Sequence, residues 1–536
     1  MNTTESLWSP DRFTQLGLKP PTTRARIPVG PQDVATVLDA ALAEKPDAVA
    51  MIGRHRRLTF AALDCEANAA AACLLARGIG PGDRIAASAG NHPDIVTAFL
   101  AAQRIGAIWL GLNRNLSAGE KRYMIDDATP RLILAEEAVL PSLPAAVPVM
   151  TIDPRGGEWN ACVQANIGAG RPGITIDPWA PAGIAYTSGT TGRPKGAVHS
   201  QHNMLVAATI AALVNGDPRA EAVRGTASPL TILNMMIGGP VSALSTGNPH
   251  VCMDRIDVAG LAEWIAREKV NTLALVPTLI QDLLTSPDIA PGDLASLTWI
   301  VVGAAMVPEG MTEVYEARFG HKPTIGYGLT ENPTVVSRTH DRTPMIQGAI
   351  GRPMRHLDVA ILDEDGQRLP AGQSGEIAIR AITQGEWANV YTPALGYWNR
   401  PDATEELLRD GWLHTGDIGS FDTDGELFIH ARRNDLIVRG GSNIYPAEIE
   451  RVIRLDPRVI DCAVLGKPDA RLGEVPVAFV QLAPGCDEAS VFAALRDRAT
   501  AELARYKLPA DWKAIDAMPR NAMGKIVKNE LKPLIG

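Results

Sequence analysis

Short apolar runs alternate with helical patterns along much of the chain, and this alternation constrains the fold more than any other feature. Strands are expected at residues 84–88, 107–111 and 131–135, and helices at 94–105 and 118–127. The same alternation recurs between residues 261 and 303. Alternating β and α units form parallel sheets that are covered by helices. The sequence therefore predicts an α/β fold with mostly parallel sheets.

Two regions depart from this pattern. Residues 359–429 are rich in strand-like runs and contain Asp-Gly turns, which predicts a small antiparallel barrel or sheet. The charged stretch 432–435 is the best boundary, because a piece of about 100 residues follows it. We therefore expect an N-terminal domain at 1–433 and a C-terminal domain at 434–536. Within the second domain, helices are expected at 447–450 and 489–506, and strands at 463–465 and 477–480.

Composition excludes several classes of protein. The 536 residues are 46% hydrophobic and 21% charged, which is typical of a globular chain with more than one core. The net charge of −9 argues against non-specific nucleic-acid binding, which needs a basic face. Neither a long apolar run nor a secretory signal is found, so we expect no membrane span and a cytoplasmic location. The six cysteines form no C-x-x-C pair and are expected to be reduced.

One loop carries an evident chemical signal. Residues 186–196 read Tyr-Thr-Ser-Gly-Thr-Thr-Gly-Arg-Pro-Lys-Gly, after the apolar run 183–186 and before a helix that Ser200 could cap. Glycines let the backbone fold closely around an anion, while hydroxyls, free N–H groups and Lys195 attract it. The loop is not a Walker loop, because Lys195 is followed by Gly196 and not by Ser or Thr. The segment predicts a phosphate grip, and a flexible surface loop is the alternative.

Further motifs follow in a fixed order. They are Tyr-Gly-Leu-Thr-Glu at 327–331, Gly-Trp-Leu-His-Thr-Gly-Asp at 411–417, and the segments 432–441, 443–450 and 519–525. Together with the loop they resemble the acyl-adenylate-forming superfamily of acyl-CoA synthetases, adenylation domains and firefly-type luciferases. The resemblance spans most of the chain. It implies an α/β protein with a large N-terminal domain of two helix-covered, mostly parallel β-sheets, a small β-barrel-like subdomain, and a small mobile α+β C-terminal domain.

The resemblance also implies a reaction. A carboxylate attacks the α-phosphate of ATP to give an acyl-adenylate and pyrophosphate, and a thiol then displaces AMP. Because two anions meet in the first step, cations are needed at its centre. The expected enzyme is an AMP-forming acid–thiol ligase that uses ATP and Mg²⁺, with coenzyme A as co-substrate. Its partners are a small-molecule carboxylic acid and coenzyme A, and a homodimer is left open.

The resemblance assigns nucleotide binding to the loop and to several later segments. The expected ATP or AMP contacts are Thr187, Ser188, Gly189, Thr190, Thr191, Gly192, Lys195, Gly303, Ala304, Ala305, Tyr327, Gly328, Thr330, Glu331, Asp417, Arg432 and Lys525. Tyr327 is expected to stack on adenine in a slot of small residues. Asp417 is expected to accept both ribose hydroxyls, with Arg432 donating beside it; a helix cap or a turn is the alternative for Asp417.

Three of these residues are assigned to catalysis. Lys525 is expected to bridge the carboxylate and the α-phosphate, the alternative being a solvated lysine near the C-terminus. Glu331 and Thr187 are expected to bind Mg²⁺, which prefers hard oxygen ligands and takes few of them from protein. A surface salt bridge is the alternative for Glu331.

The acyl pocket is assigned to Asn234, Met235, Gly303 and Gly326. Many relatives carry a Pro-x-Phe-His run here, whereas residues 229–239 lack that histidine. An apolar wall that contains methionines suits an apolar acyl group, although methionines also fill ordinary cores. No acidic residue occurs in 229–239 to pair with an α-amine. We therefore expect a hydrophobic acid, whether fatty, alicyclic or aromatic.

Coenzyme A is preferred as the thiol because no carrier-protein segment follows the predicted small domain. An enzyme that loads a free-standing carrier protein and a non-catalytic ATP-binding regulator are the alternatives. A regulator would have no use for Lys525. Asn434, Gly440 and Gly441 are assigned to the coenzyme A side and to a hinge between the domains. Asn434 fills the position where relatives usually carry Asp or Lys as a pivot, and an ordinary linker asparagine is the alternative.

Overall fold

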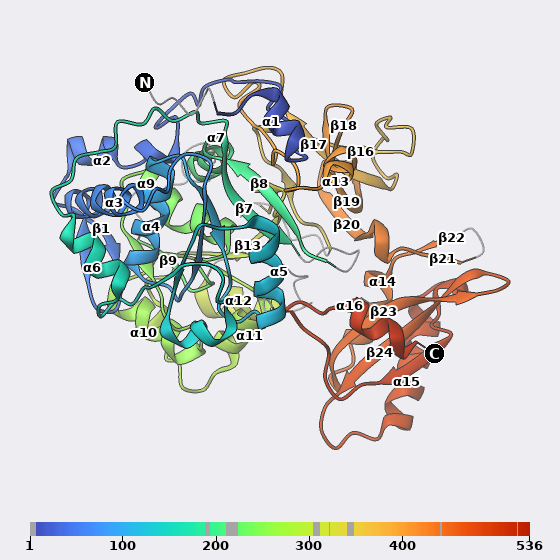
Figure 1. Cartoon of the computed structure of the whole chain (residues 1–536). Coiled ribbons are helices and arrows are strands. Elements are labelled where there is room, and N and C mark those ends of the chain that lie inside the picture. Colours follow the sequence, from blue (N-terminus) through green and yellow to red (C-terminus); the bar gives the residue numbers. More distant parts are fainter. Residues whose placement is uncertain are drawn as a thin grey trace. The chain divides into compact units, whose positions relative to one another are not determined.

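The computed structural model describes residues 7–187, 193–210, 223–303, 311–320, 322–339, 348–439, 442–521 and 524–535. The chain divides into two compact units (Figure 1). Unit 1 is formed by described residues within 1–188, 194–359 and 379–413, and unit 2 by Arg193 and described residues within 360–378 and 414–536. The domain boundary between 433 and 434 stays a prediction.

Sheet 1 of unit 1 has the strand order β6-β5-β3-β4-β7-β8. In that order its strands are Val149–Thr151, Leu132–Ala135, Arg84–Ser88, Ile108–Gly111, Pro181–Thr187 and Lys195–Ser200. Its strands pair in parallel, except for the antiparallel pair β7–β8. Strands β3 and β5 are almost wholly buried, which explains their continuous apolar runs. The predicted strands of this region are confirmed.

Sheet 2 of unit 1 has the order β15-β14-β13-β12-β11-β9-β10-β1-β2. In that order its strands are Arg352–Pro353, Asn332–Arg338, Thr324–Leu329, Trp299–Val302, Thr272–Leu275, Arg224–Thr226, His250–Cys252, Val49–Ile52 and Arg57–Thr59. The strands from β13 to β1 pair in parallel, and the edges are antiparallel. Trp264 and Tyr315 are buried in the core on this sheet. The prediction of two mostly parallel sheets is confirmed.

Unit 1 contains the helices predicted at 94–105 and 118–127 together with others. They are α1 (Pro10–Gln15), α2 (Asp39–Glu44), α3 (Phe60–Leu75), α4 (Pro93–Arg104), α5 (Ala118–Ala128), α6 (Glu158–Ala165), α7 (Gln201–Thr209), α8 (Leu233–Met236), α9 (Ser242–Ser245), α10 (Val258–Glu268), α11 (Pro277–Thr285), α12 (Met311–Phe319) and α13 (Pro401–Leu407). Ser200 caps α7 by accepting a hydrogen bond from the Asn203 N–H at 3.1 Å, as predicted. None of the described helices is long and apolar enough to cross a membrane.

The strand-rich region forms a further sheet, with the order β16-β17-β19-β18 and β20 beside β19. In chain order these strands are Leu357–Leu362, Gly375–Ala381, Leu408–Arg409, Trp412–Phe421 and Leu427–Arg432. The boundary between the units cuts β16, β17 and β19. Strand β19 pairs antiparallel with β18 and with β20, which confirms the predicted small antiparallel sheet.

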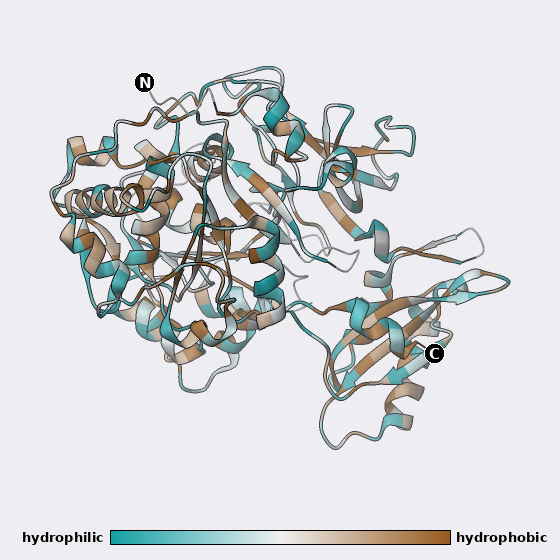
Figure 2. Ribbon diagram, in the orientation of Figure 1, coloured by the Kyte–Doolittle hydropathy of each residue, from teal (hydrophilic) through white to brown (hydrophobic). Residues whose placement is uncertain are grey.

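The C-terminal part of unit 2 is an α+β fold, as predicted. Its elements are β21 (Ile437–Arg439), β22 (Ser442–Ile444), α14 (Pro446–Arg454), β23 (Val459–Asp469), β24 (Gly473–Leu482), α15 (Glu488–Glu502), β25 (Asp511–Ala514) and α16 (Lys528–Leu531). Figure 2 shows β23 and β24 as largely hydrophobic strands, in keeping with their buried core residues. Helix α15 ends before the predicted residue 506, because Leu503 adopts an extended conformation and packs with Trp512 in this core.

A disulfide corrects the expectation that all cysteines are reduced. Cys73 of α3 is bonded to Cys162 of α6, and Arg77 donates from Nη1 to both sulfur atoms, at 3.2 and 3.0 Å. The two cysteines are 89 residues apart in sequence, so no local pattern indicates the pair. Packing of α3 against α6 brings them together. Cys65, Cys252, Cys462 and Cys486 are free thiols.

Candidate active site

The described ends of the phosphate loop lie side by side in sheet 1. Thr187 at the end of β7 pairs with Lys195 at the start of β8. The Thr187 hydroxyl donates to the Lys195 carbonyl at 3.5 Å. Antiparallel pairing therefore places the Thr187 hydroxyl and Lys195 at the same end of the sheet. Ser188, Gly189, Thr190, Thr191 and Gly192 lie outside the described residues.

The segment 394–398 joins this end of sheet 1 to sheet 2. It runs antiparallel to β8, where the Leu395 N–H donates to the Val198 carbonyl at 2.7 Å and Ala197 pairs with Tyr397. At its start, the Ala394 N–H donates to the Glu331 carbonyl at 3.0 Å. Glu331 lies in the turn between β13 and β14. One segment thus fixes the loop end and the Glu331 turn together.

Tyr397 connects the predicted carboxylate to the predicted cation. Its hydroxyl donates to Glu331 Oε1 at 2.5 Å, and Lys195 Nζ lies 5.2 Å from the centre of its ring. A cation near an aromatic face is attracted by the ring quadrupole. The structure therefore brings Glu331 and Lys195 together through a residue that the sequence analysis missed. Tyr397 belongs to no predicted motif. The one sequence feature that could have drawn attention to it is its position shortly before helix α13, which begins with a proline.

The predicted adenine slot lies at the ends of two paired strands. Val302 of β12 pairs with Ile325 of β13, and a Cβ atom on Gly303 would come within 3.1 Å of the Gly326 carbonyl oxygen. Gly303 and Gly326 are therefore brought together, with little space for a larger side chain. Tyr327 is buried in β13, beside Gly328 and three residues before Thr330. Stacking on adenine stays a prediction, and Ala304 and Ala305 lie outside the described residues.

The segment with the predicted acyl-pocket residues packs on sheet 1. A Cβ atom on Gly111 of β4 would overlap the Thr231 carbonyl, and one on Gly183 of β7 would come within 2.9 Å of Leu233. Glycines at these positions therefore allow α8 to approach the sheet closely. Asn234 and Met235 are half-buried in α8. Their contact with an acyl group stays a prediction.

In unit 2, Asp417 and Arg432 form an ion pair. They are partners on the neighbouring strands β19 and β20, with Arg432 Nε 2.8 Å from Asp417 Oδ1. Asp417 is 3% exposed, and its N–H donates to the Thr415 hydroxyl at 3.1 Å. The alternative in which Asp417 caps a helix or forms a turn is wrong, because the residue lies within a strand. The structure brings the two predicted ribose contacts together.

Glu376 of β17 organises the backbone just before Asp417. Its carboxylate accepts from the Gly416 N–H at 3.1 Å and from His414 Nδ1 at 2.9 Å. Arg433 Nη1 lies 3.4 Å from the same carboxylate. Glu376 was not identified from the sequence, because its partners are distant along the chain.

Lys525 lies on an exposed turn that is closed by local hydrogen bonds. Its N–H donates to Asn521 Oδ1 at 3.0 Å, and the Asn521 N–H donates to the Lys525 carbonyl at 2.9 Å. Arg520 Nη1 donates to the Gly524 carbonyl at 2.8 Å, and Gly524 has a φ of +76°, which suits glycine. Asn434 lies in the short 3₁₀ helix Arg433–Asp435. Gly440 and Gly441 lie outside the described residues.

Glu331 and Thr187 are the predicted oxygen ligands of Mg²⁺. The described residues contain no group of three or more His, Cys, Asp and Glu side chains that could hold a metal. Glu331 and Thr187 supply a carboxylate and a hydroxyl, both hard oxygen donors. This small donor set suits Mg²⁺, which keeps several waters and takes one or two ligands from protein beside substrate phosphates.

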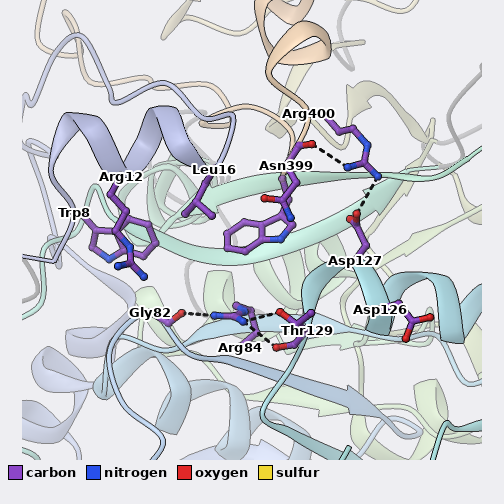
Figure 3. Close-up of a pocket in the computed structure, with 11 residues that line it drawn as sticks. Trp8, Arg12, Leu16, Gly82, Arg84, Asp126, Asp127, Thr129, Asn399 and Arg400 are labelled. Carbon is purple, nitrogen blue, oxygen red and sulfur yellow. Dashed lines mark hydrogen bonds and ion pairs between the residues drawn. The ribbon is translucent and has the colours of Figure 1, made fainter. Parts of the chain in front are cut away.

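A cavity of about 400 Å³ lies between α1, α5 and the segment 398–400 (Figure 3). It is lined by Trp8, Arg12, Leu16, Gly82, Arg84, Asp126, Asp127, Thr129, Trp398, Asn399 and Arg400. None of these residues was assigned to the predicted site. The cavity lining does not include Thr187, Lys195, Glu331 or Tyr397.

Comparison with known proteins identifies relatives that match this chain over nearly their whole length. The model of the AMP-binding enzyme family matches residues 38–386, and that of the AMP-binding enzyme C-terminal domain matches residues 448–525. The fatty acid–[acyl-carrier-protein] ligase ScoC of Streptomyces coeruleorubidus is 32% identical over 91% of this chain and 93% of its own. A second relative is a 3-[(3aS,4S,7aS)-7a-methyl-1,5-dioxo-octahydro-1H-inden-4-yl]propanoyl:CoA ligase of Mycobacterium tuberculosis. It is 33% identical over 94% of this chain and 98% of its own.

Solved structures agree with the fold. The o-succinylbenzoate CoA synthetase of Bacillus subtilis, in complex with its acyl-adenylate intermediate, is 27% identical with a TM-score of 0.81, covering 93% of this chain and 98% of that one. ATP-bound MatB from Rhodopseudomonas palustris is 28% identical, with the same TM-score and coverage. The chain therefore belongs to the AMP-binding enzyme family and is an acid–thiol ligase.

Proposed function

We propose that this chain is an ATP-dependent acyl-CoA synthetase that activates a hydrophobic carboxylic acid through an acyl-AMP intermediate. The observation that carries the proposal is the cluster of Thr187, Lys195, Glu331 and Tyr397, assembled from distant segments at the predicted phosphate loop. It occurs in a chain that matches relatives named as CoA ligases over nearly their whole length.

In the first half-reaction, a carboxylate oxygen of the acid attacks the α-phosphorus of ATP. A P–O bond forms to the acid, and the P–O bond to pyrophosphate breaks. Lys195 and the loop bind phosphate oxygens, while Lys525 balances the charge that moves between the carboxylate and the α-phosphate. Glu331 and Thr187 would hold Mg²⁺, which supplies charge neutralisation of the phosphates when bound. Asp417, oriented by Arg432, accepts from the ribose hydroxyls.

In the second half-reaction, the sulfur of coenzyme A attacks the acyl carbon of the adenylate. The thioester C–S bond forms, AMP leaves with the bridging oxygen, and the thiol proton passes to solvent or a nearby base. Lys525 serves the first step and must vacate the site for the thiol. The proposed hinge at Asn434, with Gly440 and Gly441, allows this change.

The acid is proposed to be fatty, alicyclic or aromatic. The wall formed by residues 229–239 is apolar, and Asn234, Met235, Gly303 and Gly326 would contact the acyl group. The names of two relatives support this class. A feruloyl-CoA synthase of Amycolatopsis is named for an aromatic acid, and the Mycobacterium tuberculosis ligase is named for an alicyclic acid.

A second candidate is transfer to a free-standing carrier protein. The observation that favours it is the relative ScoC, which is named as a fatty acid–[acyl-carrier-protein] ligase. Both candidates share the adenylation step and differ only in the thiol.

The test is a panel of fatty, alicyclic and aromatic acids, each supplied with ATP and Mg²⁺. We expect acid-dependent exchange of pyrophosphate into ATP, and an acyl-CoA product, detected by mass spectrometry, when coenzyme A is added. Product with phosphopantetheinylated carrier protein but not with coenzyme A would establish the second candidate. Binding of ATP without exchange for any acid would refute both and favour a regulator.

A further inference from the structure

Helix α5 places two side chains on the face towards the phosphate loop. Tyr123 and Asp127 are four residues apart, so they lie one above the other on the helix. The helix is fixed at its start by a capping box between Ser117 and Glu120. It ends at Ala128, and the next residue, Thr129, adopts a left-handed conformation with a φ of 48°. Both ends of this short helix are thus defined, and its side chains have a rigid base.

These two side chains hold opposite ends of the loop. The Tyr186 hydroxyl donates to Asp127 Oδ2 at 2.6 Å, and the Tyr123 hydroxyl donates to the Pro194 carbonyl at 3.1 Å. Tyr186 directly precedes Thr187, and Pro194 directly precedes Lys195. One helix therefore fixes the backbone beside both described residues that are assigned to phosphate binding.

Arg400 joins the two contacts into one network. Its Nη2 donates to Asp127 Oδ1 at 2.9 Å and to the Tyr123 hydroxyl at 3.1 Å, and its Nη1 donates to the Asn399 carbonyl at 2.9 Å. Figure 3 shows Arg400 reaching down to Asp127 from the segment that precedes α13. Each oxygen of Asp127 thus accepts from a different partner. The same segment carries Tyr397, which contacts Glu331 and Lys195.

The protonation states suit these hydrogen bonds. Burial, followed by the hydrogen bond to Asp127, raises the pKa of Tyr186, so its hydroxyl remains a donor at neutral pH. The hydrogen bond to Tyr123 raises the pKa of Arg400, which remains charged. Asp127 is 11% exposed on its side chain, so loss of a partner leaves a carboxylate with little water to replace it.

We propose that Tyr123, Asp127 and Arg400 form a clamp that positions Thr187 and Lys195 for the phosphates of ATP. They are positioning residues, because they act through the loop ends and not on the substrate. The inference rests on the proposed function, in which this loop binds ATP. A network that merely stabilises the fold would affect the use of both substrates, whereas a clamp on the phosphate loop affects ATP selectively.

The test is Asp127→Asn, with Asp126→Asn as its matched control. Asn has the shape of Asp, but one side of its amide presents N–H groups to a partner that also donates. We expect the KM for ATP to rise about tenfold while the KM for the acid changes little, since losing one charged partner costs about that factor. Asp126 is the next residue on α5, is exposed, and lines the same cavity. Asp126→Asn removes the same charge and should leave both KM values unchanged.

The sign of the effect separates the clamp from long-range electrostatics. Removing a negative charge near a site for a polyanion should strengthen ATP binding if only the charge matters. The clamp requires weaker ATP binding instead. Calorimetric titration of ATP into each variant measures the affinity without turnover.

Tyr123→Phe is a second test, because it removes a single hydroxyl of the clamp. It should also weaken ATP binding, and the double variant with Asp127→Asn should bind ATP only slightly more weakly than Asp127→Asn alone. ATP affinities equal to that of the wild type in Asp127→Asn and Tyr123→Phe would overturn the clamp. An inactive wild type that binds no ATP would instead refute the proposed function.

Discussion

The two parts of the proposed site are held by different kinds of contact. In unit 1, Tyr397 contacts Glu331 across 66 residues of sequence and lies beside Lys195. In unit 2, Lys525 is held by Asn521, only four residues away, on an exposed turn. A network of distant segments cannot move one member without disturbing the others. A locally closed turn can be presented to a substrate, or withdrawn from it, as one piece.

This difference agrees with the roles proposed for the two parts. Residues that bind ATP through both half-reactions need a fixed frame, because binding energy that orients a reactant is lost when the frame relaxes. A cation needed in only one half-reaction can be carried on a movable turn. Each experiment that follows perturbs one side of this comparison.

The largest effect is expected for Lys525→Ala. Loss of a charge-stabilising donor that acts in the transition state costs about 10²–10³ in rate, and a bridging cation can cost more. Because the Lys525 backbone makes the turn contacts, the fold should be retained, with an unchanged Tm. Pyrophosphate exchange measures the loss, and Lys532→Ala, an exposed lysine nearby, is the control. A near wild-type exchange rate would remove Lys525 from the mechanism.

The next effect is expected for Asp417→Ala. A carboxylate that accepts from two hydroxyls is a positioning contact, so the KM for ATP should rise about 10- to 100-fold, more than kcat falls. The KM for the acid should change little. Steady-state kinetics with each substrate varied in turn measures the split, and Asp424→Ala in an exposed turn is the control. Equal rises for both substrates would indicate a folding defect instead.

Asn434→Pro tests the hinge. Asn434 lies in a 3₁₀ helix, whose φ values proline can adopt, so the described conformation should persist. Proline fixes φ and should hinder the change of backbone angles that a hinge requires. We expect acid-dependent pyrophosphate release in a single turnover to persist, and acyl-CoA formation from supplied acyl-adenylate to fall about tenfold. If both half-reactions fall together, or neither falls, Asn434 is not the pivot.

The smallest effect is expected for Tyr397→Phe. The ring remains beside Lys195, and the hydrogen bond to Glu331 is lost. One neutral donor to a carboxylate contributes modestly, so kcat/KM for ATP should fall about threefold to tenfold. Tyr391→Phe is a matched control, because its buried hydroxyl has no hydrogen-bond partner among the described residues. An equal effect of the two variants would show that the Tyr397 hydroxyl has no special role.

Secondary structure could be predicted from the sequence wherever it depends on neighbouring residues along the chain. The strands at 84–88 and 131–135, the cap at Ser200 and the helix that begins at Pro446 follow from apolar spacing and capping, which act over a few residues. The order of the motifs likewise led to the family. These features depend on local patterns, so the sequence alone contains them.

Only the tertiary structure revealed Tyr397 between Glu331 and Lys195, the clamp from α5, Glu376 behind Asp417, and the disulfide between Cys73 and Cys162. Each joins residues that are far apart along the chain. Their meeting depends on the order of strands in the sheets and on the segment 394–398 laid along β8. Periodicity and spacing report what one element prefers, whereas such contacts depend on how whole elements pack. The sequence by itself therefore determined the elements, the family and the chemical groups, and the packing of the elements decided which groups meet.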